Sequence, residues 1–217
     1  MEHSILWFYG AALLALFPIV DPVTAGFSFA GMAEGRDVKW RNRQALLASI
    51  YMVVILFLFQ FLGTALLNFF AITLEAIRIA GGVMIWYMAM EMLGGNERLS
   101  ADEKSEGTLK DDIAFTPMAM PLLSGPGAIA VILTLNATSA TVVSDIAIVL
   151  AVITTAAVTY ITLRFASEIQ AHISDTGRIA FRKILGFLLL CVSVQFIMSG
   201  VAPLFDGGAS ALMQLSQ

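Results

Sequence analysis

Six long apolar stretches dominate this 217-residue chain and restrict what it can fold into. They cover approximately residues 4–33, 44–67, 72–95, 113–137, 142–167 and 180–202. A helix needs about 20 predominantly apolar residues to cross the hydrocarbon core of a membrane. Charged residues make up only 13% of the chain, whereas a soluble domain carries about 25%. We therefore predict an all-α membrane protein with six transmembrane helices.

The basic residues predict how these spans are oriented. If the N-terminus lies outside, the cytoplasmic segments carry 11 of the 12 lysines and arginines, all but Arg78. Cytoplasmic loops of membrane proteins are enriched in Lys and Arg. We therefore predict a multi-pass protein of the cell inner membrane with both termini extracytoplasmic. Residues 96–112 are then a cytoplasmic linker, and residues 203–217 form an extracytoplasmic tail.

The two halves of the chain share features at a constant offset of 104 residues. The aligned positions are Asp21-Pro22 with Gly125-Pro126, Arg78 with Arg182, Gly82 with Gly186, and Glu91 with Gln195. Because each half has three spans, the second half must enter the membrane from the opposite side. We predict two inverted three-helix repeats, residues 1–95 and 113–202, as in many secondary transporters. We also expect close helix packing at Gly82 and Gly186.

Two segments inside the spans cannot form regular helix. Residues 17–26 contain Pro18 and Pro22, and residues 117–127 contain three prolines and two glycines. Proline removes a backbone donor and clashes with the carbonyl four residues before it. Packing kinks would explain either segment alone. Their matched positions in the two halves instead favour helices 1 and 4 that are broken near the midplane around a binding site.

The broken segments predict a substrate site, because free N–H groups attract a carboxylate and free carbonyls attract an ammonium group or a cation. The substrate-binding candidates are Asp21, Pro22, Thr24, Ser124, Gly125, Pro126 and Gly127. Two interpretations of Asp21 remain open. Its side chain can cap the helix that restarts at Pro22, or it can bind a coupling ion. Arg78 is expected to pair with Glu75 on the surface of its helix.

Several motifs of the chain resemble the MarC family of bacterial and archaeal inner-membrane proteins. These are Phe17-Pro18-Ile19-Val20-Asp21-Pro22 with Ala33-Glu34-Gly35, the segment from Pro117 to Ile129, Arg78-Ile79-Ala80-Gly81-Gly82, and Val194-Gln195-Phe196-Ile197. The resemblance covers essentially the whole chain. It implies six spans and, for some members, transport of small neutral amino acids such as alanine, glycine or threonine. Members usually have Asn-Pro followed by a glycine and a further proline, so Asp21 and the missing second proline are a departure.

We therefore predict a secondary transporter or exporter of small neutral amino acids, of the alanine, glycine, serine and threonine class. It would work by alternating access and be coupled to protons or sodium ions, with Asp21 as the coupling site. The alternative is a non-transporting membrane scaffold or assembly factor. On that interpretation the breaks serve packing, and residues 96–112 recruit a cytosolic partner.

Other classes of function are disfavoured. The net charge is −4 and the basic residues form no stripe, so no nucleic-acid partner is expected. The spans contain no paired nucleophile and base, so we do not expect an enzyme. His3 and His172 are far apart in sequence, and neither a metal nor a cofactor is expected. The predicted partners are the lipid bilayer and a small solute, and a homo-oligomer is compatible with the sequence.

Overall fold

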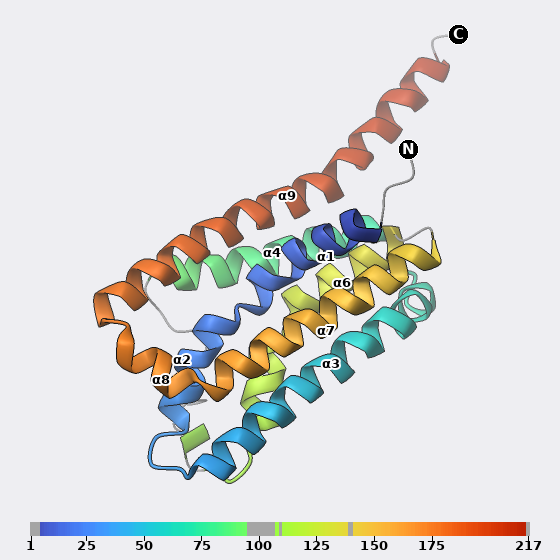
Figure 1. Ribbon diagram of the computed structural model, residues 1–217. Coiled ribbons are helices and arrows are strands. Elements are labelled where there is room, and N and C mark those ends of the chain that lie inside the picture. The colour runs from blue at the N-terminus through green and yellow to red at the C-terminus, as the bar shows by residue number, and fades with distance from the viewer. Residues whose placement is uncertain (1–4, 95–106, 109, 139–140, 216–217) are drawn as a thin grey trace.

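The computed structural model describes residues 5–94, 107–108, 110–138 and 141–215, and its regular elements are all helices. Figure 1 shows them packed side by side as an elongated bundle. The all-α class predicted from the sequence is confirmed for these residues. The elements are α1 (Ile5–Val20), α2 (Pro22–Met32), α3 (Val38–Phe69), α4 (Leu74–Leu93), η1 (Ala114–Leu123), α6 (Pro126–Thr138), α7 (Val142–Arg164), α8 (Ala166–His172) and α9 (Asp175–Leu215).

Five segments are long and apolar enough to cross a membrane, and η1 with α6 adds a sixth if this bent pair counts as one span. The two members of the pair are inclined by 60° to each other. The five segments are Ile5–Met32, Val38–Phe69, Leu74–Leu93, Val142–Arg164 and Thr176–Phe205. Each apolar stretch of the sequence therefore corresponds to one helix or one helix pair.

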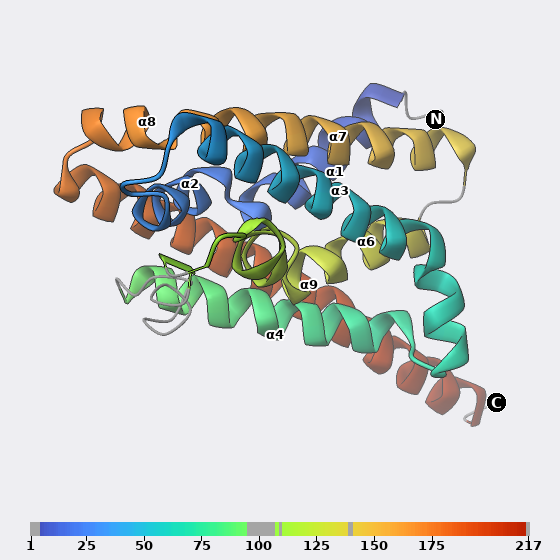
Figure 2. The same cartoon turned by 90° about the horizontal axis from the view of Figure 1, so that it is seen from below.

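Three helix pairings organise the bundle. The α1–α2 segment packs along α7, the η1–α6 segment packs along α3, and α4 packs lengthwise against α9. Figures 1 and 2 show that the end of α2, the start of α3, α8 and the start of α9 gather at one end of the molecule. We call it the basic end, after the residues in these segments and at the end of α7: Arg36, Lys39, Arg41, Arg43, Arg164, Arg178, Arg182 and Lys183.

Helices α4 and α9 approach each other closely at two glycines. A Cβ atom on Gly82 would lie 2.9 Å from the carbonyl oxygen of Ser193, and one on Gly186 would lie 3.2 Å from the carbonyl oxygen of Ala89. Only a residue without a side chain fits such contacts easily, as in other membrane helix pairs. The predicted close packing at Gly82 and Gly186 is confirmed.

The last helix is longer than predicted, because α9 continues through Pro203 to Leu215. Proline has no N–H group for the carbonyl four residues before it, which is that of Ser199. Arg78 of α4 donates a hydrogen bond from Nη1 to this carbonyl over 3.4 Å. The predicted partner Glu75 forms no ion pair with Arg78 among the described residues, but the Arg78 charge still acts electrostatically on the Glu75 carboxylate.

The predicted linker, residues 96–112, lies largely outside the described residues, which exclude 95–106 and 109. Its last residues are held against the start of α3. Arg36 pairs with Asp111 over 3.2 Å, and the indole N–H of Trp40 donates to the Asp111 carbonyl over 2.8 Å. Gln44 accepts a hydrogen bond from the Ile113 N–H over 3.1 Å. These contacts fix the chain where it enters η1.

Candidate functional site

Asp21 separates α1 from α2 and adopts the left-handed conformation, with φ 47° and ψ 69°. Asp tolerates this region better than most residues because its short side chain bonds to the nearby backbone. Here Oδ1 accepts a hydrogen bond from the Thr24 N–H over 3.2 Å, and Pro22 is the first residue of α2. The interpretation of Asp21 as a helix cap is therefore confirmed. Its role as a coupling site stays a prediction.

The Asp21 side chain is buried, with 2% of its surface exposed. Helix α9 brings positive charge to this region. The Asp21 carboxylate acts electrostatically on the guanidinium of Arg182, and Arg178 lies 5.8 Å from the ring centre of Phe27 in α2. A buried carboxylate in a membrane protein needs such a counter-charge. The sequence analysis did not connect Arg182 with Asp21, although two arginines one turn apart before an apolar stretch were a usable signal.

The second irregular segment is η1. Thr116 (φ −123°, ψ 120°) and Met120 (φ −133°, ψ 124°) are extended, because each precedes a proline that disfavours helical backbone. The Ser124 N–H donates a hydrogen bond of 2.8 Å to the carbonyl of Ala119, five residues before it, whereas an α-helix joins residues four apart. Regular helix resumes only at α6.

The sequence predicted that residues 17–26 cannot form regular helix, but the first interruption is confined to Asp21, since α1 ends at Val20 and α2 begins at Pro22. This interruption and η1 lie close together inside the protein, because α2 contacts η1 and α1 contacts α6. A Cβ atom on Gly127, at the start of α6, would lie 3.3 Å from the side chain of Ile19 in α1 and 3.2 Å from Ile85 in α4. Ile19 is only two residues before Asp21. A Cβ atom on Gly125 would lie 2.5 Å from a carbonyl oxygen of its own segment. The small residues of the second segment therefore allow it to pack against the end of α1.

Each irregular segment carries a buried hydroxyl group. The side chains of Thr24 and Ser124 are 1% and 0% exposed, and neither hydroxyl has a hydrogen-bond partner among the described residues. Burying an unsatisfied polar group costs about 1–3 kcal/mol. Ser193, which is equally buried, differs because its hydroxyl donates to the Leu190 carbonyl over 2.7 Å. Thr24 and Ser124 are therefore suited to bind a ligand or a water molecule.

The remaining predicted site residues divide into two groups. Pro22, Gly125 and Gly127 are buried with Asp21, Thr24 and Ser124. Pro126 is exposed and lines a different cavity, of about 240 Å³, between α4 and α6. That cavity is apolar, with Gly81 and Ala130 among its lining residues. The structure therefore does not place Pro126 with the other candidates.

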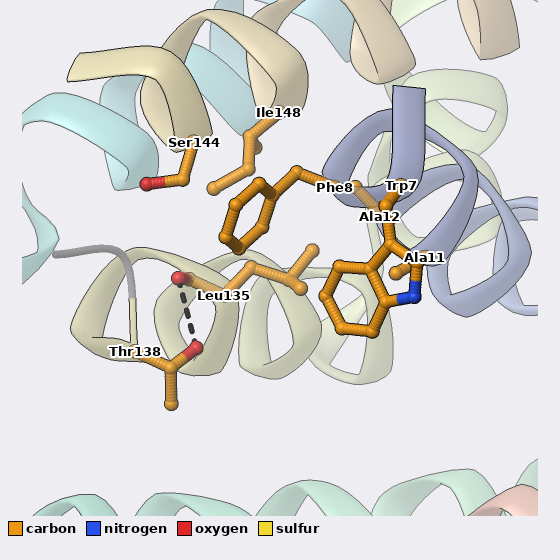
Figure 3. Close-up of a pocket in the computed structure, with 8 residues that line it drawn as sticks. All are labelled: Trp7, Phe8, Ala11, Ala12, Leu135, Thr138, Ser144 and Ile148. Atoms are coloured by element: carbon orange, nitrogen blue, oxygen red, sulfur yellow. Dashed lines mark hydrogen bonds between the residues drawn. The ribbon is translucent and has the colours of Figure 1, made fainter. Parts of the chain in front are cut away.

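A cavity of about 320 Å³ lies at the end of the molecule opposite the basic end. It is formed by the start of α1, the end of α6 and the start of α7. Figure 3 shows Trp7 and Phe8 projecting from α1 toward Leu135 on α6 and Ile148 on α7. Tyr9 follows Phe8 in the chain, and its hydroxyl donates a hydrogen bond to the Thr154 hydroxyl of α7 over 3.0 Å.

A second cavity, of about 480 Å³, lies at the basic end between the end of α2, the start of α3 and α8. Glu34, Arg36, Arg41 and Gln170 are among the residues that line it. Buried residues close the interface between the two cavities. These include Leu16 and Val20 from the first half, and Val152, Thr155 and Thr159 from α7.

The α7 threonines were not selected from the sequence. Thr155 and Thr159 each donate a hydrogen bond of 2.8 Å to the carbonyl four residues before them, those of Ala151 and Thr155. The hydroxyls are satisfied within the helix, as is usual for threonine in apolar helices. Their spacing of four residues in an apolar stretch was the available signal.

The sequence profile of the family described as "MarC family integral membrane protein" matches residues 6–205. The chain belongs to the MarC family. Inner membrane protein MarC of Escherichia coli strain K12 is 32% identical to it, with 88% of this chain and 93% of that protein covered. The MarC proteins of Shigella flexneri and Shigella boydii serotype 4 match with the same values. No solved structure matches.

The family resemblance seen in the sequence motifs is thus confirmed, and the curated relatives are inner membrane proteins. In this MarC-family chain the two most distinctive motifs coincide with the two irregular segments. Residues 17–22 end α1 and place Asp21, whereas residues 117–129 form most of η1 and the start of α6. The motifs that identify the family therefore lie where the two halves meet.

Proposed function

We propose that this MarC-family protein is a secondary transporter of small neutral amino acids that works by alternating access, and that it is not an enzyme. The observation that carries the proposal is the meeting of two irregular segments, one from each half, in the protein interior. Each brings a buried hydroxyl without a partner among the described residues. Secondary transporters bind their substrates at such helix interruptions.

The chemistry of the segments suits an amino acid. The start of a helix presents free N–H groups to a carboxylate, and irregular backbone presents carbonyls to an ammonium group. The hydroxyls of Thr24 and Ser124 can donate a hydrogen bond to the carboxylate and accept one from the ammonium group. Buried apolar residues lie close to these two hydroxyl residues in the sequence, namely Ala25, Leu123 and Ala128. These apolar neighbours favour a substrate with a small neutral side chain.

We further propose that the protein consists of two inverted repeats, with the interruptions near the membrane midplane. The α4–α9 contacts support this, because they are reciprocal at the offset of 104 residues. Gly82 contacts Ser193, and its equivalent Gly186 contacts Ala89, the equivalent of Ser193. The other pairings are also exchanged between halves, since α1–α2 packs on α7 and η1–α6 packs on α3.

The two cavities support alternating access. They lie at opposite ends of the interface between α1–α2 and the α7–α8 segment, and buried side chains close the interface between them. Hydrogen bonds join the two halves toward each of these ends. Tyr9 bonds to Thr154 near one, and Arg41 donates to Ser167 over 2.6 Å at the other. Opening either end would require the bonds at that end to break.

A binding screen tests the proposal first. The purified protein is melted in the presence of each of the twenty amino acids, with and without sodium and at two pH values. A ligand that binds the native state raises the melting temperature. We expect alanine, glycine, serine or threonine to stabilise the protein, with a dependence on sodium or pH that identifies the coupling ion.

Counterflow of labelled alanine into proteoliposomes then tests the site. Ser124→Ala should raise the KM for alanine by about threefold to tenfold, because one hydrogen bond contributes about 0.5–1.5 kcal/mol. Ser193→Ala is the matched control and should transport like wild type, since its buried hydroxyl is satisfied within its own helix. Folded protein that exchanges none of the small neutral amino acids would refute the proposed function.

A further inference from the structure

The cavity at the basic end contains a cation with unused donors. Arg41 is half-buried and lines this cavity. One of its guanidinium nitrogens donates to Ser167, and no carboxylate of the described residues pairs with it. Arg36 lines the same cavity but is engaged with Asp111 and with the Lys110 carbonyl, over 3.2 and 2.9 Å. A guanidinium carries five N–H groups, so Arg41 keeps donors for an anionic group.

The same cavity also contains acceptors. The side-chain oxygen of Gln170 is buried and has no hydrogen-bond partner in the part of the chain that the structure describes. Glu34 lines the cavity and forms no ion pair within that part. A carboxylate and an amide oxygen together suit an ammonium group, which offers three donors and no acceptor.

Most of the remaining lining is small. Ala30, Gly31, Ala33, Gly35 and Ala171 contribute no more than a methyl group each. They leave a cavity of about 480 Å³, which is within the usual range for small-molecule sites. Among the described residues no large apolar side chain lines the cavity, so they do not favour an extended hydrophobic ligand.

We propose that this cavity binds a zwitterionic α-amino acid, with its carboxylate on Arg41 and its ammonium group on Glu34 and Gln170. It is a second site, separate from the irregular segments, through which the solute enters or leaves at the basic end. That the bound amino acid is also the transported one rests on the proposed function. The requirement for both charges rests only on the cavity.

The test is calorimetric titration of the full-length protein in nanodiscs of phosphatidylglycerol, which supply no zwitterionic headgroup. The probes are alanine, alaninamide, N-acetylalanine and glycerophosphoethanolamine. Alanine should bind, whereas alaninamide lacks the carboxylate, N-acetylalanine lacks the ammonium group, and both should bind much more weakly. Repeating the titration with Ser124→Ala distinguishes this cavity from the site between the irregular segments.

Arg41→Gln should weaken alanine binding roughly tenfold or more, because it removes a charge-assisted hydrogen bond. Glu34→Gln should weaken it about threefold, since an exposed charge contributes less. Arg43→Gln is the matched control. It removes an exposed cation of the same helix that does not line the cavity, so alanine affinity should not change.

Unchanged alanine affinity in both Arg41→Gln and Glu34→Gln would overturn the proposal. So would a wild-type protein that binds no alanine, or one that prefers glycerophosphoethanolamine, which would assign the cavity to a lipid headgroup. Counterflow of alanine with the same protein variants in proteoliposomes decides the proposed function separately. Transport that persists while the cavity fails these tests leaves the function standing and removes only the second site.

Discussion

The Asp21 carboxylate has two structural roles. One oxygen caps α2 through the Thr24 N–H, and the charge acts on Arg182 of α9. An asparagine would keep the capping oxygen and lose the charge. A single substitution can therefore separate the capping role from the role of the charge.

We expect Asp21→Asn to fold and to lose ion-driven alanine uptake, because a neutral amide cannot exchange a proton and binds sodium more weakly than a carboxylate does. The measurement is uptake into proteoliposomes under an imposed proton or sodium gradient, beside the melting temperature. Asp37→Asn is the matched control, since Asp37 caps α3 in the same way through the Trp40 N–H. Gradient-dependent uptake that is unchanged in Asp21→Asn would exclude this residue as the coupling site.

At the scale of the helices, local sequence predicts where regular structure fails better than where a helix ends. The apolar stretches located the spans, and prolines marked both irregular segments. The same reasoning ended the last helix before Pro203, whereas α9 continues to Leu215. The donor that satisfies the freed carbonyl comes from Arg78, 121 residues earlier in the chain than Ser199. Such compensation between distant helices is not visible in a local pattern.

A double-mutant cycle tests this compensation. Arg78→Met should lower the free energy of unfolding by about 1–3 kcal/mol, because it leaves the Ser199 carbonyl without a partner. Pro203→Ala restores a helical N–H for that carbonyl, so Arg78→Met should lower the free energy of unfolding by less in the Pro203→Ala protein. The apparent melting temperature is measured for all four proteins. Equal losses with and without Pro203 would show that Arg78 acts through another contact.

Across the whole molecule, the sequence indicated buried polar residues beside the motifs but not the cavities. Asp21, Thr24 and Ser124 could be selected as candidates because prolines close to them interrupt an apolar stretch. The cavity at the basic end instead collects residues from α2, α3 and α8. Arg41 and Gln170 are 129 positions apart in the chain, and nothing in either local sequence indicates that they line one cavity. Only the packing of the two halves brings them together.

The inverted arrangement makes a prediction about which side of the membrane each half faces. Phe70 and Ser174 are equivalent at the offset of 104 residues, and both are exposed in turns between helices. Figure 1 shows the α3–α4 turn and the α8–α9 turn at opposite ends of the bundle. Equivalent positions of inverted repeats should face opposite sides of the membrane.

Single cysteines at these positions test the topology in a Cys191→Ala background, which removes the native cysteine. A membrane-impermeant maleimide should label Phe70→Cys in intact cells. It should label Ser174→Cys only after permeabilisation, because the basic residues around the α8–α9 turn favour the cytoplasm. Labelling of both from the same side would contradict the inverted repeats, since halves in parallel orientation would expose equivalent turns together. Opposite accessibility with the sides exchanged would keep the repeats and reverse only the orientation, so this one pair of variants tests the architecture and the direction separately.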